Sequence, residues 1–414
     1  MKKEIINNLD NPRQLERLYR DNNTTFKRAF NLMYQDIQDN PTAQIWNERL
    51  NFQDEEISWG TGEELFFVII ATFIAGLIAK IPEIIVIQED FFYPRNFSFI
   101  VFPLLTAYFS WRQRIQTKRI VISSIAIVCS VIYINVLPNN IKSDTLILAC
   151  IHLPLLLWTI VGISFVGDNV KNLQRRLDFL RYNGDLVVMT TIILIAGGIL
   201  TGITVGLFRL IDPGIKEFYF KYIVIWGVAA SPIVGTYLVR ANPQLVNKVS
   251  PVIAKVFTPL VLITLIIYLI AVIATGKDPY NDRDFLLIFN LLLIGVMAII
   301  LFSIAETSKK SDSSLGMLLL LTLSIVTVIV NGIALTAIVF RISEWGITPN
   351  RLAVLGGNVL ILTNLLIVIY RFVKTVKDRN EIGNIEGSIA SFLPFYSLWA
   401  IVVTFLFPFL FNFK

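Results

Sequence analysis

The polar residues best placed to do chemistry lie in a short link between two apolar segments. The link reads Arg341-Ile342-Ser343-Glu344-Trp345-Gly346-Ile347-Thr348-Pro349-Asn350-Arg351. A glutamate between two arginines at a membrane interface could act as an acid or base on a lipid or glycan. The same residues also suit a structural hairpin with an ion-pair network, because glycine permits a turn and proline fits the first turn of a helix. The candidate functional residues in this link are Arg341, Glu344, Trp345, Asn350 and Arg351.

Three further polar residues lie inside apolar segments. Asn331 and Asn358 flank the link, and an asparagine within a membrane helix either lines a polar cavity or bonds to a neighbouring helix. His152 is the only histidine and lies two residues before Pro154. It could relay protons or line a pore, or it could be a neutral imidazole bonded to a carbonyl that the proline leaves free. Both alternatives stay open for each residue.

Several kinds of chemistry lack the residues that they need. One histidine and two cysteines, Cys129 and Cys150, provide neither a zinc site nor a catalytic triad, so we expect no metal and no cofactor. The 36 basic and 30 acidic residues are too nearly balanced to indicate nucleic-acid binding. All 30 carboxylates lie outside the apolar segments, which disfavours transport coupled to protons or sodium through an intramembrane carboxylate.

The elements that position these residues are long apolar runs. Hydrophobic residues make up 55% of the 414-residue chain and charged residues only 16%, where a soluble protein carries about 25%. Eleven runs approach the roughly 20 residues that a helix needs to cross a bilayer. They are residues 65–82, 97–111, 120–137, 145–166, 186–208, 222–239, 252–274, 285–305, 316–340, 352–370 and 391–412. Backbone polar groups in lipid must be satisfied within each segment, so the sequence predicts an all-α, polytopic transmembrane helix bundle.

The distribution of lysine and arginine predicts the orientation of this bundle. If the N-terminus is cytoplasmic, 25 of these residues lie on the cytoplasmic side and 11 on the outer side. Because positive residues are retained on the cytoplasmic side, we expect a cytoplasmic N-terminus and an external C-terminus. Lys80, Pro82 and Arg95 shorten the apolar length of the first two runs, and their full crossing is left open.

Residues 1–64 differ in composition from residues 65–414, and we expect them to form a short helical cytoplasmic segment before the transmembrane domain. They hold 8 basic and 12 acidic residues and no long apolar run. The Asn-Pro pairs at 11–12 and 40–41 each predict the start of a short helix. The buried residues that we expect in the second helix are Ile45, Trp46 and Leu50.

Two local patterns predict how helices start and pack. Thr61 and Glu64 have the spacing of a capping box at the start of the first membrane helix. Gly198, Gly202 and Gly206 lie on one helix face at four-residue spacing, which predicts close packing against another helix of the same chain. The pattern leaves the oligomeric state open.

The link and the N-terminal segment together resemble a known family. The matching pattern is Arg341-x-x-Glu344-Trp345-Gly346-Ile347-Thr348-x-Asn350-Arg351, followed by a long apolar helix. Residues 43–50 (Ala-Gln-Ile-Trp-Asn-Glu-Arg-Leu) and 55–60 (Glu-Glu-Ile-Ser-Trp-Gly) are also similar. The family comprises uncharacterised bacterial multi-spanning membrane proteins, catalogued as a domain of unknown function. The resemblance covers nearly the whole chain and implies a multi-pass protein of the bacterial cytoplasmic membrane, without assigning a reaction or a ligand.

Three hypotheses for the function follow from the sequence, all with the lipid bilayer as surroundings. The first is a permease or channel-like protein for a small or amphiphilic molecule. A water-accessible cavity lined by the intramembrane histidine or asparagines would favour it. The second is a membrane signalling or assembly scaffold whose residues 1–64 bind a cytoplasmic protein. The third is a membrane enzyme that acts on lipid or glycan through Glu344 with Arg341 and Arg351.

Overall fold

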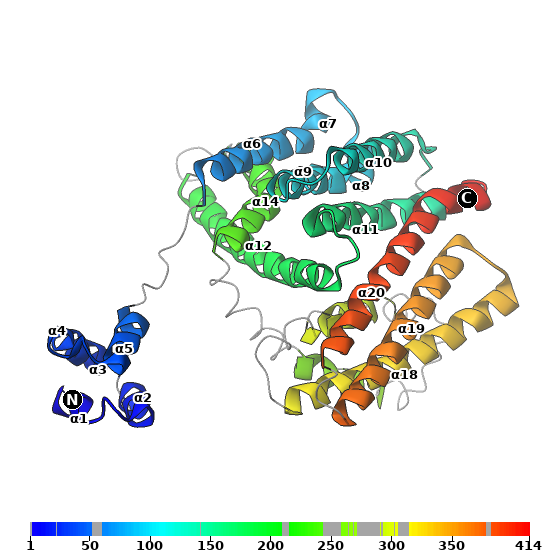
Figure 1. Ribbon diagram of the computed structural model, residues 1–414. Coiled ribbons are helices and arrows are strands. Elements are labelled where there is room, and N and C mark those ends of the chain that lie inside the picture. The colour runs from blue at the N-terminus through cyan, green and yellow to red at the C-terminus, as the bar shows by residue number, and fades with distance from the viewer. Residues whose placement is uncertain are drawn as a thin grey trace. The chain divides into compact units, whose positions relative to one another are not determined.

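The structure is a computed structural model that describes the chain in several segments. The described residues are 2–21, 23–51, 60–140, 142–208, 215–242, 258–263, 265–267, 269–270, 290, 293–301, 303–304, 314–377 and 382–414. All regular structure in these residues is helical (Figure 1). The chain forms two compact units, Met1–Ser58 and Trp59–Lys414, which we call the N-terminal unit and the membrane unit.

The N-terminal unit is a set of short helices with its own core. Its helices are α1 (Lys2–Asn7), α2 (Pro12–Asp21), α3 (Asn23–Asn31), α4 (Tyr34–Ile37) and α5 (Pro41–Asn51). Asn40 caps α5, because its side-chain oxygen accepts hydrogen bonds from the backbone N–H groups of Thr42 and Ala43 at 2.8 and 3.3 Å. Phe26 and Phe30 are fully buried in the core.

One residue that we expected in this core is exposed. Ile45 keeps 69% of its surface exposed, whereas Trp46 and Leu50 are buried as predicted. The buried residues of α5 are Ala43, Trp46 and Leu50, which follow the three- and four-residue spacing of one helix face. Ile45 is one position from Trp46 and is therefore rotated about 100° away from that face.

The membrane unit consists of long apolar helices joined by short ones. In chain order these are α6 (Gly62–Ala79), α7 (Ile81–Ile84), α8 (Glu89–Asn96), η1 (Phe97–Ile100), α9 (Phe102–Arg112), α10 (Thr117–Val136), α11 (Asp144–Val166), α12 (Leu173–Phe208), α13 (Ile215–Phe218), η2 (Tyr219–Val224), α14 (Ile225–Ala241), α18 (Ser314–Trp345), α19 (Pro349–Lys377), α20 (Ile382–Ile401), η4 (Val402–Leu406) and α21 (Phe407–Leu410). The elements η2 and η4 are π-helical.

Eight helices among the described residues are long and apolar enough to cross a membrane. These candidate spans are Gly62–Ala79, Thr117–Val136, Asp144–Val166, Leu173–Gly202, Tyr219–Ala241, Met317–Trp345, Pro349–Lys374 and Gly387–Leu410. Each contains a stretch of 18 or more residues that matches the hydrocarbon thickness of a bilayer. The protein is therefore a multi-pass integral membrane protein.

Eight of the eleven predicted runs coincide with these helices, and the other three differ. Residues 97–111 form the 3-10 turn η1 and most of the 11-residue helix α9, which is shorter than a candidate span. Pro103 lies in the first turn of α9, and its missing N–H interrupts the helical hydrogen bonds there. The runs at 252–274 and 285–305 lie largely outside the described residues.

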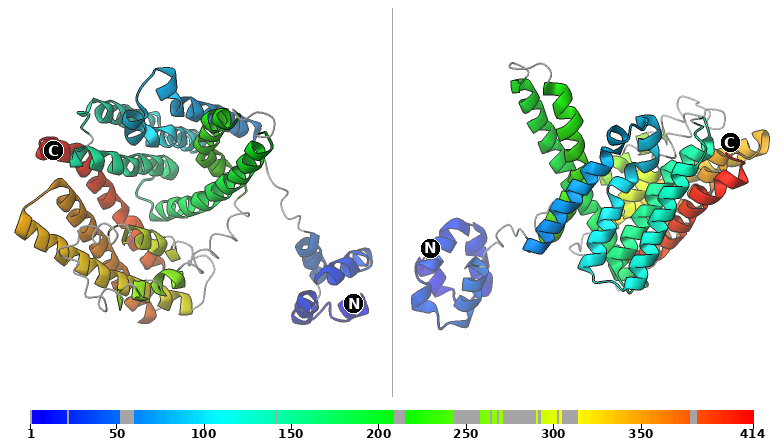
Figure 2. Two further views of the ribbon diagram at one scale, coloured as in Figure 1. Left: turned by 180° about the vertical axis from the view of Figure 1, so that it is seen from behind. Right: turned by 90° about the horizontal axis from the view of Figure 1, so that it is seen from above.

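The helices of the membrane unit pack in two groups that α11 joins. α6 packs on α14 and α14 on α12, while α18 packs on α19 and α19 on α20. Views from behind and from above show α18, α19 and α20 side by side (Figure 2). α11 contacts α9, α19 and α20, and its Trp158 packs against the apolar core of each group.

Glycines permit close helix contacts in this unit, at positions other than the predicted ones. A Cβ atom added to Gly76 of α6 would lie 2.5 Å from the Trp226 ring, and one added to Gly356 of α19 would lie 2.0 Å from the Trp399 ring. By contrast, a Cβ atom added to Gly198 or Gly202 would meet no described atom within 4 Å. The described residues therefore provide no packing partner for these two glycines, which lie on the exposed half of α12.

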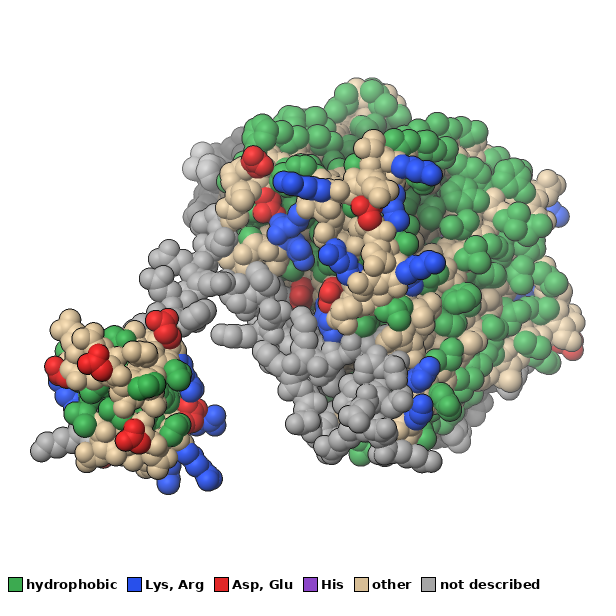
Figure 3. Space-filling view, viewed as in Figure 1, with side chains coloured by type: hydrophobic (Ala, Val, Ile, Leu, Met, Phe, Trp, Pro, Cys, Tyr) green, Lys and Arg blue, Asp and Glu red, His purple; other side chains and the backbone are tan. Residues whose placement is uncertain are grey.

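One face of the membrane unit, which we call the basic face, gathers the ends of several helices. Arg112 pairs with Glu64, which joins the end of α9 to the start of α6. Arg119 donates to the Gly167 carbonyl at 3.1 Å, which joins the start of α10 to the end of α11. Figure 3 shows charged side chains of the membrane unit gathered in one area of the visible face, beside wide apolar areas. The basic residues near these helix ends also include Arg114, Lys118, Lys171, Arg175, Arg176, Arg181 and Arg240.

The opposite helix ends meet at a second face. Lys221 of η2 pairs with Glu83 of α7 at 3.2 Å, and Lys80 pairs with the same carboxylate. Partial burial raises the pKa of Glu83, but hydrogen bonds from Lys80 and Lys221 outweigh it and hold that pKa below its usual range. At the C-terminus, the Lys414 carbonyl accepts a hydrogen bond of 3.0 Å from the Thr145 N–H at the start of α11.

Candidate functional site

The predicted link between residues 341 and 351 is a tight helical hairpin. α18 ends at Trp345 and α19 begins at Pro349, as the sequence predicts. Gly346 has a φ of +75°, which only glycine adopts at little cost, and its N–H donates to the Ile342 carbonyl at 2.9 Å. Arg351 closes the turn, because its Nη1 donates to the carbonyls of Trp345 and Gly346 at 2.9 and 2.6 Å.

The charged residues of the hairpin do not form the expected ion-pair network. The guanidinium groups of Arg341 and Arg351 lie over the Trp345 ring, at 5.5 and 5.6 Å from its centre. In the described structure Glu344 is exposed and pairs with neither arginine. Asn350 is half-buried in the first turn of α19. The arrangement therefore satisfies both cations with an aromatic ring and leaves the carboxylate in solvent.

The intramembrane asparagines join helices instead of lining a described cavity. Asn331 Nδ2 donates to the Asn358 carbonyl at 3.1 Å, and Asn358 Nδ2 donates to Asn290 Oδ1 at 2.8 Å. Asn364, on α19, donates to the Tyr396 hydroxyl of α20 at 3.1 Å. The Oδ1 atoms of Asn331 and Asn364 are buried without a hydrogen-bond partner. These contacts bond α18, α19 and α20 to one another, as polar residues in membrane helices commonly do.

His152 bonds to its own helix. Its Nδ1 lies 2.9 Å from the Leu148 carbonyl, four residues earlier in α11. We expected a carbonyl freed by Pro154, which would be the one of Cys150. No hydrogen bond in the described structure joins His152 to the asparagines or to the hairpin, so the sequence-predicted residues do not form one site.

A site that the sequence did not predict lies between α11, the start of α12 and α20. It is a cavity of about 440 Å³, which we call the Arg176 cavity. Its lining residues are Trp158, Thr159, Gly162, Ile163, Val166, Val170, Arg176, Phe179, Leu393, Pro394, Ser397, Leu398 and Ile401. The lining on α11 runs from Trp158 to Val166, nine residues that span about 12 Å along the helix. All but a few of these side chains are apolar.

Arg176 is the only charged residue that lines this cavity in the described structure. Its Nε donates to the Val170 carbonyl at 2.8 Å and its Nη1 to the Ala390 carbonyl at 3.1 Å. The Ala390 carbonyl is free for this bond because Pro394, four residues later in α20, has no N–H. A guanidinium has five N–H groups, so three of those on Arg176 remain for a ligand.

The remaining polar groups of the cavity are already bonded. Thr159 and Ser397 share a hydrogen bond of 2.9 Å between their hydroxyl oxygens, which joins α11 to α20. Ile163 and Leu398 at the cavity are 39% and 58% exposed, on the candidate spans α11 and α20. The cavity is therefore open at the surface of these two helices, and its one cation in the described structure is Arg176.

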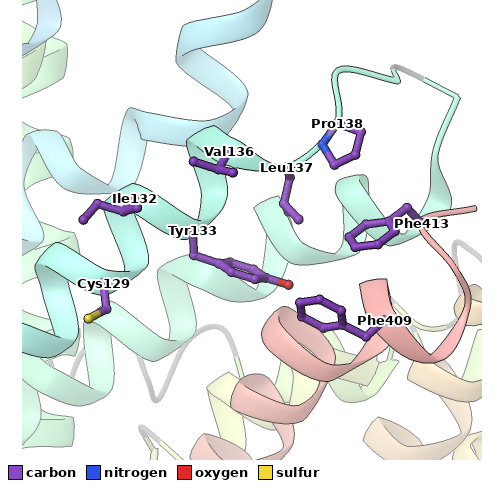
Figure 4. A pocket seen from close by; sticks show the side chains of 8 residues that line it. All are labelled: Cys129, Ile132, Tyr133, Val136, Leu137, Pro138, Phe409 and Phe413. Carbon is purple, nitrogen blue, oxygen red and sulfur yellow. The ribbon is translucent and has the colours of Figure 1, made fainter.

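A second cavity of about 440 Å³ lies between α10 and the C-terminal helices (Figure 4). Its lining residues are Cys129, Ile132, Tyr133, Val136, Leu137, Pro138, Phe409 and Phe413. The Tyr133 hydroxyl donates to the Phe405 carbonyl in π-helical η4 at 3.2 Å. No charged side chain lines this cavity, so it offers room for an apolar chain without a group that would recognise a headgroup.

Some carboxylates lie in the helical turns that precede the predicted apolar runs. α6 begins at Gly62 and α12 at Leu173, before the apolar runs at 65 and 186, so Glu64 and Asp185 lie within helices that are candidate spans. Glu64 is only 6% exposed. A glutamate one residue before an apolar run is a sequence signal for a place in the first turn of the helix, as Glu64 has in α6.

Comparisons with known proteins assign no relationship. No family model matches the chain, and no curated protein or solved structure matches it either.

Proposed function

We propose that this protein is a permease for an amphiphilic molecule with an anionic headgroup. The observation that carries the proposal is the Arg176 cavity, an apolar space open at the surface of α11 and α20, with one cation in its described lining. A volume of about 440 Å³ is within the usual range for ligand pockets, which are mostly apolar with few polar groups that orient the ligand. The headgroup would bind the free N–H groups of Arg176 while the apolar part lies against α11 and α20.

The predicted topology of eleven spans in the bacterial cytoplasmic membrane, with the N-terminus inside, belongs to this proposal. The Glu64–Arg112 pair supports it, because it joins the start of α6 to the end of α9. The end of α9 then lies on the same side of the membrane as the start of α6. The concentration of arginine and lysine at the basic face supports a cytoplasmic position for that face. Membership of the uncharacterised bacterial family that the chain resembles is also part of this proposal.

The test is lipid translocation by the purified protein. The full chain is reconstituted in phosphatidylcholine vesicles that contain a trace of fluorescent phosphatidylglycerol, and an external quencher reports the lipid that reaches the outer leaflet. Arg176→Gln removes the headgroup contact and is expected to slow translocation about tenfold, the effect of losing one charge-assisted hydrogen bond. Leu398→Trp fills the cavity and is expected to slow it similarly.

Two matched variants make this test specific. Arg175→Gln removes the neighbouring, exposed arginine, which does not line the cavity, and Leu366→Trp adds the same ring at a 50% exposed position of α19. Both are expected to translocate lipid at the wild-type rate. A wild-type rate no higher than that of protein-free vesicles would refute the permease, as would full activity of both cavity variants.

A second candidate function, a membrane scaffold, is favoured by the separate core of the N-terminal unit. Phe26 and Phe30 are fully buried there, whereas Leu32 and Ile45 are 65% and 69% exposed on the same small unit. A contiguous apolar patch marks a protein-binding surface, whereas single exposed side chains are common, so the separate core is what favours this function. Deletion of residues 1–60 would abolish capture of a cytoplasmic partner while lipid translocation persists if both functions are present.

A further inference from the structure

A second charged group lies at the basic face, on α6, α9 and α14. The Glu64 carboxylate accepts hydrogen bonds from the Tyr108 hydroxyl and from Arg112. Arg112 Nη1 also donates to the Tyr108 hydroxyl at 2.9 Å. Tyr108 is 2% exposed and Glu64 is 6% exposed, so the carboxylate and its first arginine form a satisfied, largely buried pair.

Arg240, in the last turn of α14, is the fourth member of this group, but the other members accept no hydrogen bond from it. It lies within electrostatic range of Arg112 and Glu64, yet it forms no hydrogen bond and no ion pair in the described structure. Its Nε atom is buried without a partner. The guanidinium carbon lies 5.5 Å from the centre of the Phe165 ring, which supports the cation but accepts no N–H hydrogen bond of ordinary strength.

The charges of this group do not balance. Two arginines face one carboxylate, and Arg112 already binds that carboxylate. An arginine stays protonated in a protein, so a buried Nε–H without an acceptor is a lasting energetic penalty. A cation at the C-terminal end of a helix is favourable, but an exposed guanidinium achieves the same interaction without burial. Arg240 is half-buried and its Nε is fully buried without an acceptor in the described structure, so the group leaves one positive charge and a set of donors for an external anion.

We propose that Arg240 is the centre of an anion site for a tetrahedral oxyanion of the phosphate type. The planar fork of the guanidinium matches two oxygens of such an anion, and a charge-assisted bond would satisfy the buried Nε–H. The phosphate could belong to a free anion in the cytosol or to a lipid headgroup at the membrane surface. This site is separate from the Arg176 cavity, whose arginine lies on α12 beside α20.

The experiment is a phosphate titration of the full chain in a neutral detergent. Thermal unfolding is followed by tryptophan fluorescence while inorganic phosphate replaces chloride at constant ionic strength. The wild type is expected to gain a saturable increase in its unfolding temperature, because a ligand that binds only the native state stabilises it. Arg240→Gln is expected to weaken phosphate binding about tenfold or more.

Two further variants separate a site from general screening. Arg175→Gln removes an exposed arginine of the same face that already donates to Gln113, and it is expected to bind phosphate as the wild type does. Arg240→Lys keeps the charge but loses the fork, so binding should weaken less than in Arg240→Gln. Arg240→Lys also provides a folded comparison if Arg240→Gln is not monodisperse.

A second experiment, with lipid in place of free phosphate, identifies the source of the phosphate. The same proteins are measured in nanodiscs of phosphatidylcholine with and without phosphatidylglycerol. Stabilisation by phosphatidylglycerol alone, lost in Arg240→Gln, assigns the site to a lipid headgroup, and stabilisation by inorganic phosphate assigns it to a free anion. The proposal is overturned if neither ligand gives a saturable shift, or if Arg240→Gln responds as strongly as the wild type.

Discussion

Two places in the membrane unit contain the same components, two arginines, one glutamate and aromatic rings, and arrange them in opposite ways. In the hairpin, Arg341 and Arg351 lie over one tryptophan, and the glutamate is exposed. In the group at the basic face, Glu64 is buried against one arginine, and the Nε of the second arginine has no acceptor in the described structure. The hairpin is complete as it stands, whereas the basic-face group is not.

This difference shows why local density of charged residues is a poor guide to a ligand site. The hairpin residues are neighbours in sequence, so their own turn provides backbone carbonyls that accept from Arg351. The basic-face residues lie on three separate helices, and the buried Nε of Arg240 meets no carbonyl acceptor in the described structure. A cation in that position depends on side chains or on a ligand, and only one carboxylate is present.

The largest expected effect comes from Glu64→Gln. The change leaves Arg112 and Arg240 near each other without a counter-charge, and breaking a buried pair is strongly destabilising. We expect a loss of roughly 2–3 kcal/mol of stability, at the lower end because the Arg112 side chain is 30% exposed. The measurement is unfolding of the purified protein in mixed detergent micelles as the denaturing detergent fraction rises.

Phosphate gives this prediction its control. If an oxyanion binds beside Arg240, added phosphate should recover part of the stability lost in Glu64→Gln, since it supplies a negative charge. If Glu64→Gln is clearly less stable and phosphate restores none of that stability, Glu64 has a structural role that is independent of the proposed anion site. A stability equal to that of the wild type would contradict the burial of the pair.

Trp345→Ala is the corresponding change in the hairpin and should have a smaller effect. It removes the ring that lies beneath Arg341 and Arg351, and exposed cation–π contacts contribute about 0.5–1 kcal/mol each. We expect a loss of about 1–2 kcal/mol in the same unfolding measurement, with Trp345→Phe losing less because a ring remains. An equal loss in both variants would indicate that the indole packs and does not interact with the cations.

The hairpin and the membrane class could be predicted from sequence because both depend on residues that are close along the chain. Gly346 and Pro349 locate the turn, and apolar runs locate eight helices of spanning length. The basic-face group could not be predicted this way, because Glu64, Arg112 and Arg240 come from separate helices. Glu64 was interpreted as a helix cap, and Thr61 does cap α6 by accepting from the Glu64 N–H at 3.2 Å.

The Arg176 cavity depends on contacts of still longer range. Arg176 bonds to the Ala390 carbonyl, 214 residues away in the chain. The local signal for this bond is Pro394, which leaves a carbonyl free one turn earlier in an apolar helix. That signal shows that a donor is needed but does not identify it, since many arginines lie at the same face. The packing of α12 against α20 places Arg176, and not another arginine, next to this carbonyl.

A third group of charges lies at the second face, and its contribution to stability should depend on pH. Glu83 binds both Lys80 and Lys221, and its pKa in the folded protein is held below the ordinary 4.5. A depressed pKa means that the ionised carboxylate stabilises the fold above about pH 4.5 and that this contribution disappears as the pH falls through the lower, folded value. Because the group is close to solvent, the contribution should be below about 1 kcal/mol.

The measurement for Glu83 compares the unfolding midpoints of the wild type and Glu83→Gln between about pH 6 and pH 3, where a carboxylate titrates. The difference between the two proteins should be greatest at the upper end and should shrink toward zero as the pH falls. A difference that stays constant over this range would mean that packing of Glu83, and not its charge, stabilises the second face.

The smallest expected effect is that of Glu344→Gln in the hairpin. The side chain is exposed and pairs with neither arginine in the described structure, so the change should alter stability by less than about 0.5 kcal/mol. Lipid translocation should also be unchanged, because the residue lines neither described cavity. An enzyme that used this carboxylate as an acid or base would lose its activity with the amide, at unchanged stability. Such a loss would show that the hairpin is the reactive site of the protein. The role of Arg240 would then be structural.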